Sequence, residues 1–182
     1  MLRNKFIVAL SFFAFTTLAA AQSPVPKGNV FFGYSYLSAD LNSNDRSNLN
    51  GWEGSLEGKV FPFVGIVADF SGHYGSNDFP SSTAIIHVNG HENNYMFGPR
   101  VSFSVSKLRP FAHALIGAGH VSVSATGFSA SDTSLATAIG GGVDYHLIPA
   151  LAWRFQGDYL QTRFFGNTQN NARFSTGLVL NF

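Results

Sequence analysis

The sequence predicts an all-β protein, an eight-stranded antiparallel up-and-down β-barrel that spans a membrane. Three observations indicate this fold. Apolar and polar side chains alternate with a period of two in eight segments, the connections alternate in length, and aromatic residues gather near the segment ends. No segment after residue 21 has the long apolar run that a transmembrane helix needs. Because unpaired backbone groups find no water in lipid, the sheet must close into a barrel.

The composition of the 182-residue chain fits a membrane-embedded sheet. The chain has 19 Gly, 19 Phe and no Cys, and 12% of its residues are charged, against roughly 25% in soluble domains. This profile disfavours disorder, coiled coils and disulfide scaffolds. Since the net charge is +1 and no basic run occurs, we expect no nucleic-acid partner.

Residues 1–21 have the features of a secretory signal peptide. Arg3 and Lys5 precede an apolar stretch over residues 6–18, and three alanines follow it before Gln22. The apolar stretch is shorter than the roughly 20 residues that a spanning helix needs, so a retained helical anchor is the weaker alternative. We therefore expect export, cleavage, and a mature barrel domain over residues 22–182.

The N-terminal half contains four predicted strands. Residues 29–37 place Val, Phe and Tyr on one side, and residues 52–60 alternate apolar residues or Gly with Glu, Ser, Glu and Lys. Residues 64–74 alternate Val, Ile, Ala, Phe and Tyr with Asp, Ser and His. Residues 92–103 set Tyr, Phe and Val against Asn, Arg and Ser. Each strand thus has an apolar face for lipid and a polar face for the interior.

The C-terminal half contains the other four. Residues 110–122 are rich in Gly and Ala, so the pattern does not assign their facing. Residues 135–146 set Leu, Ile, Val and Tyr against Asp and His, and residues 151–159 set Leu, Trp, Phe and Tyr against Arg, Gln and Asp. Residues 173–182 alternate Phe and Leu with Arg, Ser and Asn, which completes eight strands.

The predicted connections differ at the two ends of the barrel. Tight turns are expected near residues 61–62, 104–108 and 147–149. Long loops rich in Asn, Ser, Asp and Gly are expected at residues 38–48, 75–91, 123–134 and 162–171. Short turns at one end and long loops at the other are typical of outer-membrane barrels.

Aromatic residues form two predicted girdles at the membrane interfaces. The girdle near the long loops would contain Tyr36, Trp52, Tyr74 and Tyr159. The girdle near the short turns would contain Phe63, Phe103, Phe111, Tyr145, Trp153 and Phe182. A secreted β-sandwich with an aromatic core is the competing fold, but it leaves the charged faces of so many strands unexplained.

Four segments resemble the family of small eight-stranded outer-membrane barrels represented by the outer-membrane protein A transmembrane domain and OmpX-like proteins. They are residues 51–58, 97–100, 140–145 and 177–182. The resemblance implies location in the bacterial outer membrane, contact with its lipids and lipopolysaccharide, and no cofactor. It also implies that Phe182, with Leu180 and Leu178, is the signal recognised by the outer-membrane assembly machinery.

The predicted inward face carries charges of both signs in nearly equal number. The acidic residues are Glu53, Glu57, Asp69, Asp144 and Asp158, and the basic residues are Lys59, Arg100, Arg154 and Arg173. Buried charges persist only when they are paired, so we expect an ion-pair network in the lumen, with Asp158 as a candidate partner of Arg154. Side chains fill the lumen of an eight-stranded barrel, which argues against a wide pore.

Three weaker hypotheses concern chemistry. The inward carboxylates with His73 or His146 could form an acid/base site, although a packed lumen admits no substrate. His87, His91 and Glu92 could bind a metal, but solvated loop histidines are the more common case. Residues 120–122 (His-Val-Ser) with Asp132 resemble the His-x-Ser plus acid arrangement of lipid A deacylases, with Asp in place of Glu.

Two classes of function fit these features. The favoured class is a structural or surface-interaction protein, not an enzyme, in which the barrel is an anchor and the long polar loops contact partners. The alternative is a small membrane-embedded lipid-modifying enzyme or a narrow transporter of a small apolar compound. Loop length and composition favour the first class.

Overall fold

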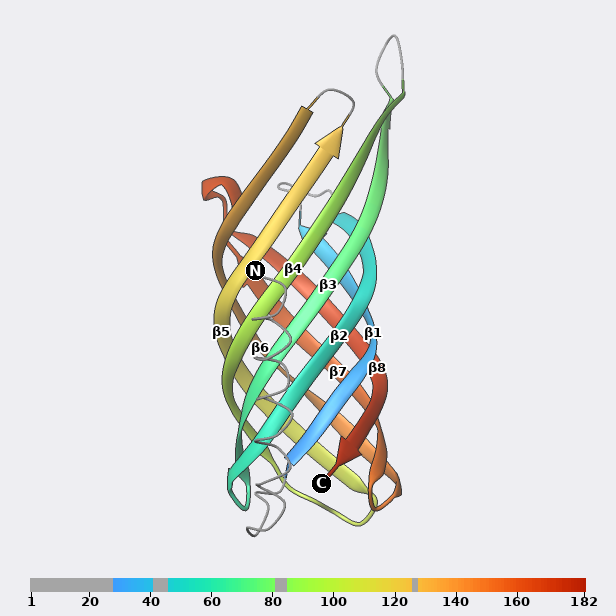
Figure 1. Ribbon diagram of the computed structural model, residues 1–182, viewed down its shortest axis with the longest axis vertical. Coiled ribbons are helices and arrows are strands. Elements are labelled where there is room, and N and C mark those ends of the chain that lie inside the picture. The colour runs from blue at the N-terminus through green and yellow to red at the C-terminus, as the bar shows by residue number, and fades with distance from the viewer. Residues whose placement is uncertain (1–27, 41–45, 81–84, 126–127) are drawn as a thin grey trace, which may run out of the picture.

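The computed structural model describes residues 28–40, 46–80, 85–125 and 128–182 and is a closed barrel of eight antiparallel strands (Figure 1). Each strand pairs with its sequence neighbour, and the first pairs with the last. The strands are β1 (Gly28–Asp40), β2 (Arg46–Phe61), β3 (Val64–Pro80), β4 (Ile85–Ser102), β5 (Leu108–Ala125), β6 (Phe128–Ile148), β7 (Leu151–Thr162) and β8 (Gln169–Asn181). The predicted fold class is therefore confirmed, whereas the predicted signal peptide lies outside the described residues.

The two longest of the four predicted long loops are mostly strand. β3 and β4 stay in register as far as the pair Pro80↔Ile85, and β5 and β6 as far as Ala125↔Phe128. The predictions of loops at residues 75–91 and 123–134 are thus wrong over most of their length. Polar side chains suggested loops, but beyond the lipid both faces of a sheet are solvated, so a strand there needs no apolar face.

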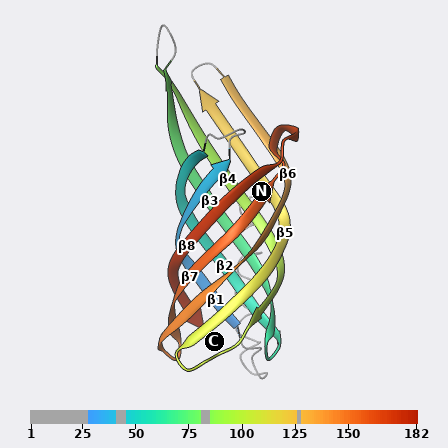
Figure 2. The ribbon, with the colours of Figure 1, turned by 180° about the vertical axis from the view of Figure 1, so that it is seen from behind.

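The strands rise to unequal heights at the long-loop end. β2 and β3 pair as far as Asn50↔Tyr74, and β6 and β7 as far as Ala136↔Thr162. Beyond these pairs, residues 75–80, 85–91, 122–125 and 128–135 continue together as a four-stranded extension, which we call the protruding sheet. Both views show it standing above the remaining four strands (Figures 1 and 2).

Side chains alternate between the lipid face and the lumen, except at register shifts near the short turns, between Lys59 and Phe61 and between His146 and Ile148. Phe32 is 64% exposed and Ile139 is 68% exposed, whereas Glu53, Arg100 and Arg173 are fully buried. The alternation also fixes the facing of β5, which the sequence left open. Its odd positions Phe111, His113 and Leu115 point inward, and its even-numbered alanines and Ile116 point outward. Within the described residues, no helix is long and apolar enough to cross a membrane.

The aromatic girdles agree with the sequence at all positions but one. Tyr74, Tyr159, Phe63 and Phe182, for example, are exposed on the outer surface. Phe111 is the exception, because it is buried in the lumen, where its ring lies under the guanidinium groups of two arginines. Its assignment to a girdle was wrong because the facing of β5 could not be read from Gly and Ala.

The seam between β1 and β8 supplies a test of closure. A β-carbon added at Gly177 would overlap the Cα atom of Gly33 and the carbonyl oxygen of Phe32. We expect Gly177→Val to destabilise the barrel by about 1–3 kcal/mol or more through overpacking. Gly58→Val is the matched control, since a β-carbon at Gly58 has no neighbour within 4 Å.

The measurement is the fraction of protein that shifts in apparent size between unboiled and boiled gel samples. A Gly177→Val barrel as resistant to unfolding as Gly58→Val would contradict the tight approach of the first and last strands.

Candidate functional site

The lumen contains every charged residue that the sequence assigned to it. Glu53, Glu57, Asp69, Arg100, Asp144, Arg154, Asp158 and Arg173 are buried there, and Lys59 is nearly so. They form three groups that differ in charge, and a layer of buried apolar side chains packs beside them.

The group nearest the short turns gathers three cations around one carboxylate. Lys59 Nζ lies 2.7 Å and Arg109 Nη2 lies 3.2 Å from Glu57 Oε1, and Arg100 Nη1 lies 3.3 Å from Glu57 Oε2. Asn29 Nδ2 also donates to Glu57 Oε2 at 2.9 Å. The net side-chain charge of this group is therefore +2.

The second group is a single ion pair on neighbouring strands, beside the first group, since Asp144 is opposite Arg109 in the β5–β6 pairing. Arg154 donates to both oxygens of Asp144, from Nε at 2.7 Å and from Nη2 at 2.9 Å. The two residues are directly opposite in the β6–β7 pairing. The guanidinium group lies over Phe31 and Phe111, 4.9 and 4.6 Å from the ring centroids. The sequence-based suggestion of Asp158 as the partner of Arg154 is wrong.

The third group reverses the charge ratio, because three carboxylates surround one arginine. Arg173 Nη1 lies 2.8 Å from Asp69 Oδ1, Nη2 lies 2.7 Å from Asp158 Oδ2, and Nε lies 3.5 Å from Glu53 Oε2. Since all four side chains are fully buried, Arg173 is the charge on which this part of the lumen depends.

Neutral donors complete the third group. Gln156 Nε2 donates to Glu53 Oε1 at 2.7 Å and to Asp158 Oδ2 at 2.9 Å, and Ser175 Oγ donates to Glu53 Oε2 at 2.5 Å. His113 Nε2 lies 2.8 Å from Asp158 Oδ1. These contacts satisfy carboxylate oxygens that a single arginine cannot reach.

Three ionisable residues of the lumen were missed by the sequence analysis. Arg109 and His113 lie on β5, whose facing was unassigned, and Glu92 begins the predicted strand over residues 92–103 but was considered only with the loop histidines. Glu92 is buried and accepts a hydrogen bond from Asn94 Nδ2 at 3.0 Å. The sequence contains a pattern that could have indicated the first two. Arg109, Phe111 and His113 occupy alternate positions, and small alanines that face lipid stand at residues 112 and 114.

An apolar layer also fills part of the lumen. Its members are buried aliphatic residues from seven strands: Leu37, Ala39, Leu49, Val67, Met96, Leu115, Ala136, Ala138 and Leu160. Phe164, from a short 3-10 turn between β7 and β8, is also buried, and its ring packs against Gly119 on the inner face of β5. The interior thus combines buried ion pairs with an apolar layer.

The hypothesis of a His120, Ser122 and Asp132 triad is wrong. His120 Nδ1 lies 2.8 Å from Thr133 Oγ1, and Asp132 accepts from the backbone N–H groups of Thr133 and Phe165. His120 and Ser122 are at positions of β5 whose side chains point outward, whereas Asp132 is at a position of β6 whose side chain points inward. Side chains on opposite faces of a sheet cannot form a proton relay.

The histidines of the acid/base and metal-site hypotheses make different contacts from those predicted. His73 Nε2 lies 2.8 Å from Ser35 Oγ, and His146 Nδ1 lies 3.3 Å from the carbonyl oxygen of Lys107. Among the histidines whose side chains the structure describes, His113 is the one that forms an ion pair with a carboxylate. His91 is exposed and Glu92 is buried, while the side chain of His87 lies outside the described residues. Among the described residues, no group of three or more His, Cys, Asp or Glu is placed to hold a metal ion.

The predicted assembly signal lies on the outer surface. Leu178, Leu180 and Phe182 all point toward lipid and are about half exposed. Phe182 and Gly28 exchange backbone hydrogen bonds of 3.0 Å at the seam. Recognition of these residues by the assembly machinery stays a prediction.

Comparisons with known proteins agree with this architecture. The family model described as outer membrane protein beta-barrel domain matches residues 7–182. Ail, the attachment invasion locus protein of Yersinia pestis, is similar at 18% identity and a TM-score of 0.61, covering 86% of this chain and 99% of that chain. Neisserial surface protein A is similar at 13% identity and a TM-score of 0.64, covering 85% and 97%.

The fold is also similar to that of the outer membrane protease OmpT of Escherichia coli, at 8% identity and a TM-score of 0.51, covering 86% of this chain and 97% of that chain. A comparison with curated proteins finds no match. At such low identities, the structural likenesses show the fold alone.

Removal of one buried partner should test the pairing. We expect Arg154→Met to destabilise the barrel by about 3–5 kcal/mol, because Asp144 is left buried and unpaired. The double variant Arg154→Met with Asp144→Leu should recover much of that loss, since no isolated charge remains. The measurement is urea unfolding of the barrel refolded into lipid vesicles.

The matched control is Arg163→Met, which removes an exposed arginine at the loop end and should change stability by less than about 0.5 kcal/mol. If Arg154→Met were as stable as Arg163→Met, the prediction would be wrong, because water in the lumen would then be solvating the carboxylate of Asp144.

Proposed function

The chain belongs to the outer membrane protein beta-barrel domain family and lies in the bacterial outer membrane, and from this premise we propose that it is a surface-interaction protein. In this proposal the barrel is an anchor and the protruding sheet is the contact surface. The sequence-based version assigned the contact to long polar loops. The strand extensions of β3 to β6 replace two of those loops as the proposed contact element.

The protruding sheet is the observation that carries the proposal. Its outer strands, residues 75–80 of β3 and 128–135 of β6, extend past the last β2–β3 and β6–β7 pairs. Backbone N–H and C=O groups on the edge of a sheet can pair with an added strand or with polar ligands. The β6 edge is contacted at Asp132 and Ser134 by the backbone of Phe165 and Arg163, so residues 75–80 of β3 and 128–131 of β6 are the proposed contact edges. Because short turns face the periplasm in this class of barrel, the sheet faces the outside of the cell.

The contents of the lumen support an anchor over a transporter or enzyme. Buried ion pairs, the apolar layer and Phe164 occupy the interior along its length. The one nucleophile arrangement that the sequence suggested is split between two faces of the sheet. The outward aromatic and aliphatic side chains contact outer-membrane lipids and, in the outer leaflet, lipopolysaccharide.

Conductance measurements test the closed lumen. We expect planar-bilayer recordings of the purified protein to show no large, stable conductance, because ions meet packed charges and an apolar layer. A 16-stranded porin in the same chamber is the positive control. Stable porin-like steps from this protein would contradict the anchor proposal.

Shortening the protruding sheet tests the contact surface. Replacing residues 77–88 and 123–130 each with Asn-Gly would join Ser76 to Asn89 and Ser122 to Ser131, which are paired residues, through two-residue hairpin turns. Cells displaying this variant should lose binding to surfaces coated with extracellular matrix or lipopolysaccharide. The barrel should still insert, because its lipid-facing strands are unchanged.

Thr126→Asn is the matched control, because it creates the same Asn-Gly pair in a full-length chain and should bind like the wild type. Undiminished binding by the shortened variant would refute the role of the protruding sheet.

A further inference from the structure

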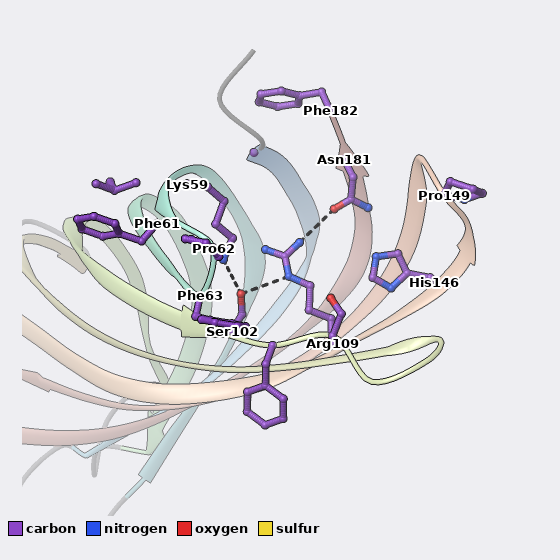
Figure 3. Close-up of a pocket in the computed structure, with 14 residues that line it drawn as sticks. Lys59, Phe61, Pro62, Phe63, Ser102, Arg109, His146, Pro149, Asn181 and Phe182 are labelled. Atoms are coloured by element: carbon purple, nitrogen blue, oxygen red, sulfur yellow. Dashed lines mark hydrogen bonds between the residues drawn. The ribbon is translucent and has the colours of Figure 1, made fainter. Parts of the chain in front are cut away.

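A cavity opens at the short-turn end of the barrel, opposite the protruding sheet. Its volume is about 920 Å³, and its polar lining includes Lys59, Ser102, Arg109, His146 and Asn181 (Figure 3). Apolar side chains of the turns, including Phe63 and Phe103, form the rest of the wall. The size is typical of a small-molecule site, and the short turns place the opening on the periplasmic side.

The cavity is adjacent to the group of three cations that share Glu57. Lys59 and Arg109 reach the cavity and are 14% and 12% exposed, whereas Arg100 and Glu57 beneath them are fully buried. One carboxylate neutralises one of three positive charges, so the side chains of this group leave an excess of +2 beside the cavity. Since the neighbouring Asp144 is bound to Arg154, it does not reduce this excess.

The hydrogen bonds at the cavity wall leave donors unused. Lys59 Nζ donates to Ser102 Oγ at 2.5 Å and Arg109 Nε donates to the same atom at 3.3 Å, so the Ser102 hydroxyl hydrogen is free to donate elsewhere. Arg109 Nη1 donates to Asn181 Oδ1 at 3.4 Å, while Asn181 Nδ2 is buried without a partner. A lysine has three N–H groups, of which Glu57 and Ser102 take two.

This donor set is complementary to an oxyanion. From the geometry we propose that the cavity is a phosphate-binding site, which takes the phosphate group of a phospholipid headgroup or of a small periplasmic phosphate ester. The phosphate would accept from Lys59, Arg109 and Ser102, with Asn181 as a further donor, and would compensate the excess positive charge, as charge-assisted hydrogen bonds do. Its organic part would contact the apolar wall.

The two sources of phosphate differ in how they would enter. A phospholipid of the inner leaflet has its headgroup at the level of the short turns, where Phe61, Phe63 and Phe182 are exposed to lipid. A soluble ester would enter from the periplasm through the open end. Both sources present the same group to Lys59 and Arg109, so the experiment must separate them.

Calorimetric titration of the full-length protein, purified in phosphate-free nonionic detergent, tests the proposal. The probes are glycerol 3-phosphate for a soluble ester and dihexanoyl phosphatidylglycerol for a headgroup. Saturable binding of both probes supports a site for the phosphate group itself. Saturable binding of the lipid alone, or of glycerol 3-phosphate alone, supports the corresponding source.

Two variants locate the binding. Arg109→Gln should weaken it by about tenfold or more, because an ionic donor at the cavity wall is lost. Ser102→Asp should abolish it, since a carboxylate at this position would itself bind Lys59 and Arg109. Ser102→Asp keeps every cation, so it remains informative if Arg109→Gln does not fold.

Lys107→Gln is the matched control, because Lys107 carries the same charge at the same end but does not line the cavity. It should bind both probes like the wild type. The proposal is overturned if neither probe binds saturably, if Lys107→Gln weakens binding as much as Arg109→Gln, or if Ser102→Asp binds normally. None of these results would affect the role proposed for the protruding sheet.

Discussion

Closure of the sheet between β1 and β8 is the constraint on which the rest of this structure depends. A membrane-spanning sheet with free edges would leave backbone groups without partners in lipid, so the first and last strands must pair. Small residues make this close approach possible, since Gly33 and Gly177 meet across the seam. Once the ring is closed, every strand has one face toward lipid and one toward a narrow interior, and alternation becomes obligatory.

The narrow interior then decides which charges can coexist. Polar residues on the inward faces cannot reach bulk water, so each charge needs a partner or a donor nearby. The protein meets this need unevenly along the axis. Arg173 holds three carboxylates with the help of Gln156 and Ser175, whereas Glu57 holds three cations. The lumen is consequently negative toward the long loops and positive toward the short turns.

The two ends of the barrel differ in the kind of contact that they can make. The outer end carries a four-stranded extension with backbone edges that can accept a partner, and the inner end carries a cavity whose unused groups are donors. Ion pairs and an apolar layer separate them. The proposed surface contact outside and the proposed phosphate contact inside would therefore be independent of each other.

The sequence by itself determined the barrel, its eight strands, the facing of seven of them and the location of nine charged residues in the lumen. It could do so because period-two alternation records directly which side of a strand meets lipid. β5 was the strand it left unassigned, since Gly and Ala are small on both faces. Because the facing of β5 was unassigned, Arg109 and His113 were not predicted to lie in the lumen, and Phe111 was wrongly assigned to a girdle.

Only the tertiary structure decided which charges meet and how far the strands extend. Asp144, ten residues from Arg154 in the chain, is its partner because antiparallel register places the two opposite each other, while Asp158 pairs with Arg173 across the next interface. Register follows from the pairing of whole strands, which no local pattern contains. The protruding sheet escaped the sequence analysis for a related reason, because above the membrane water solvates both faces and the alternation that marks a spanning strand is no longer required.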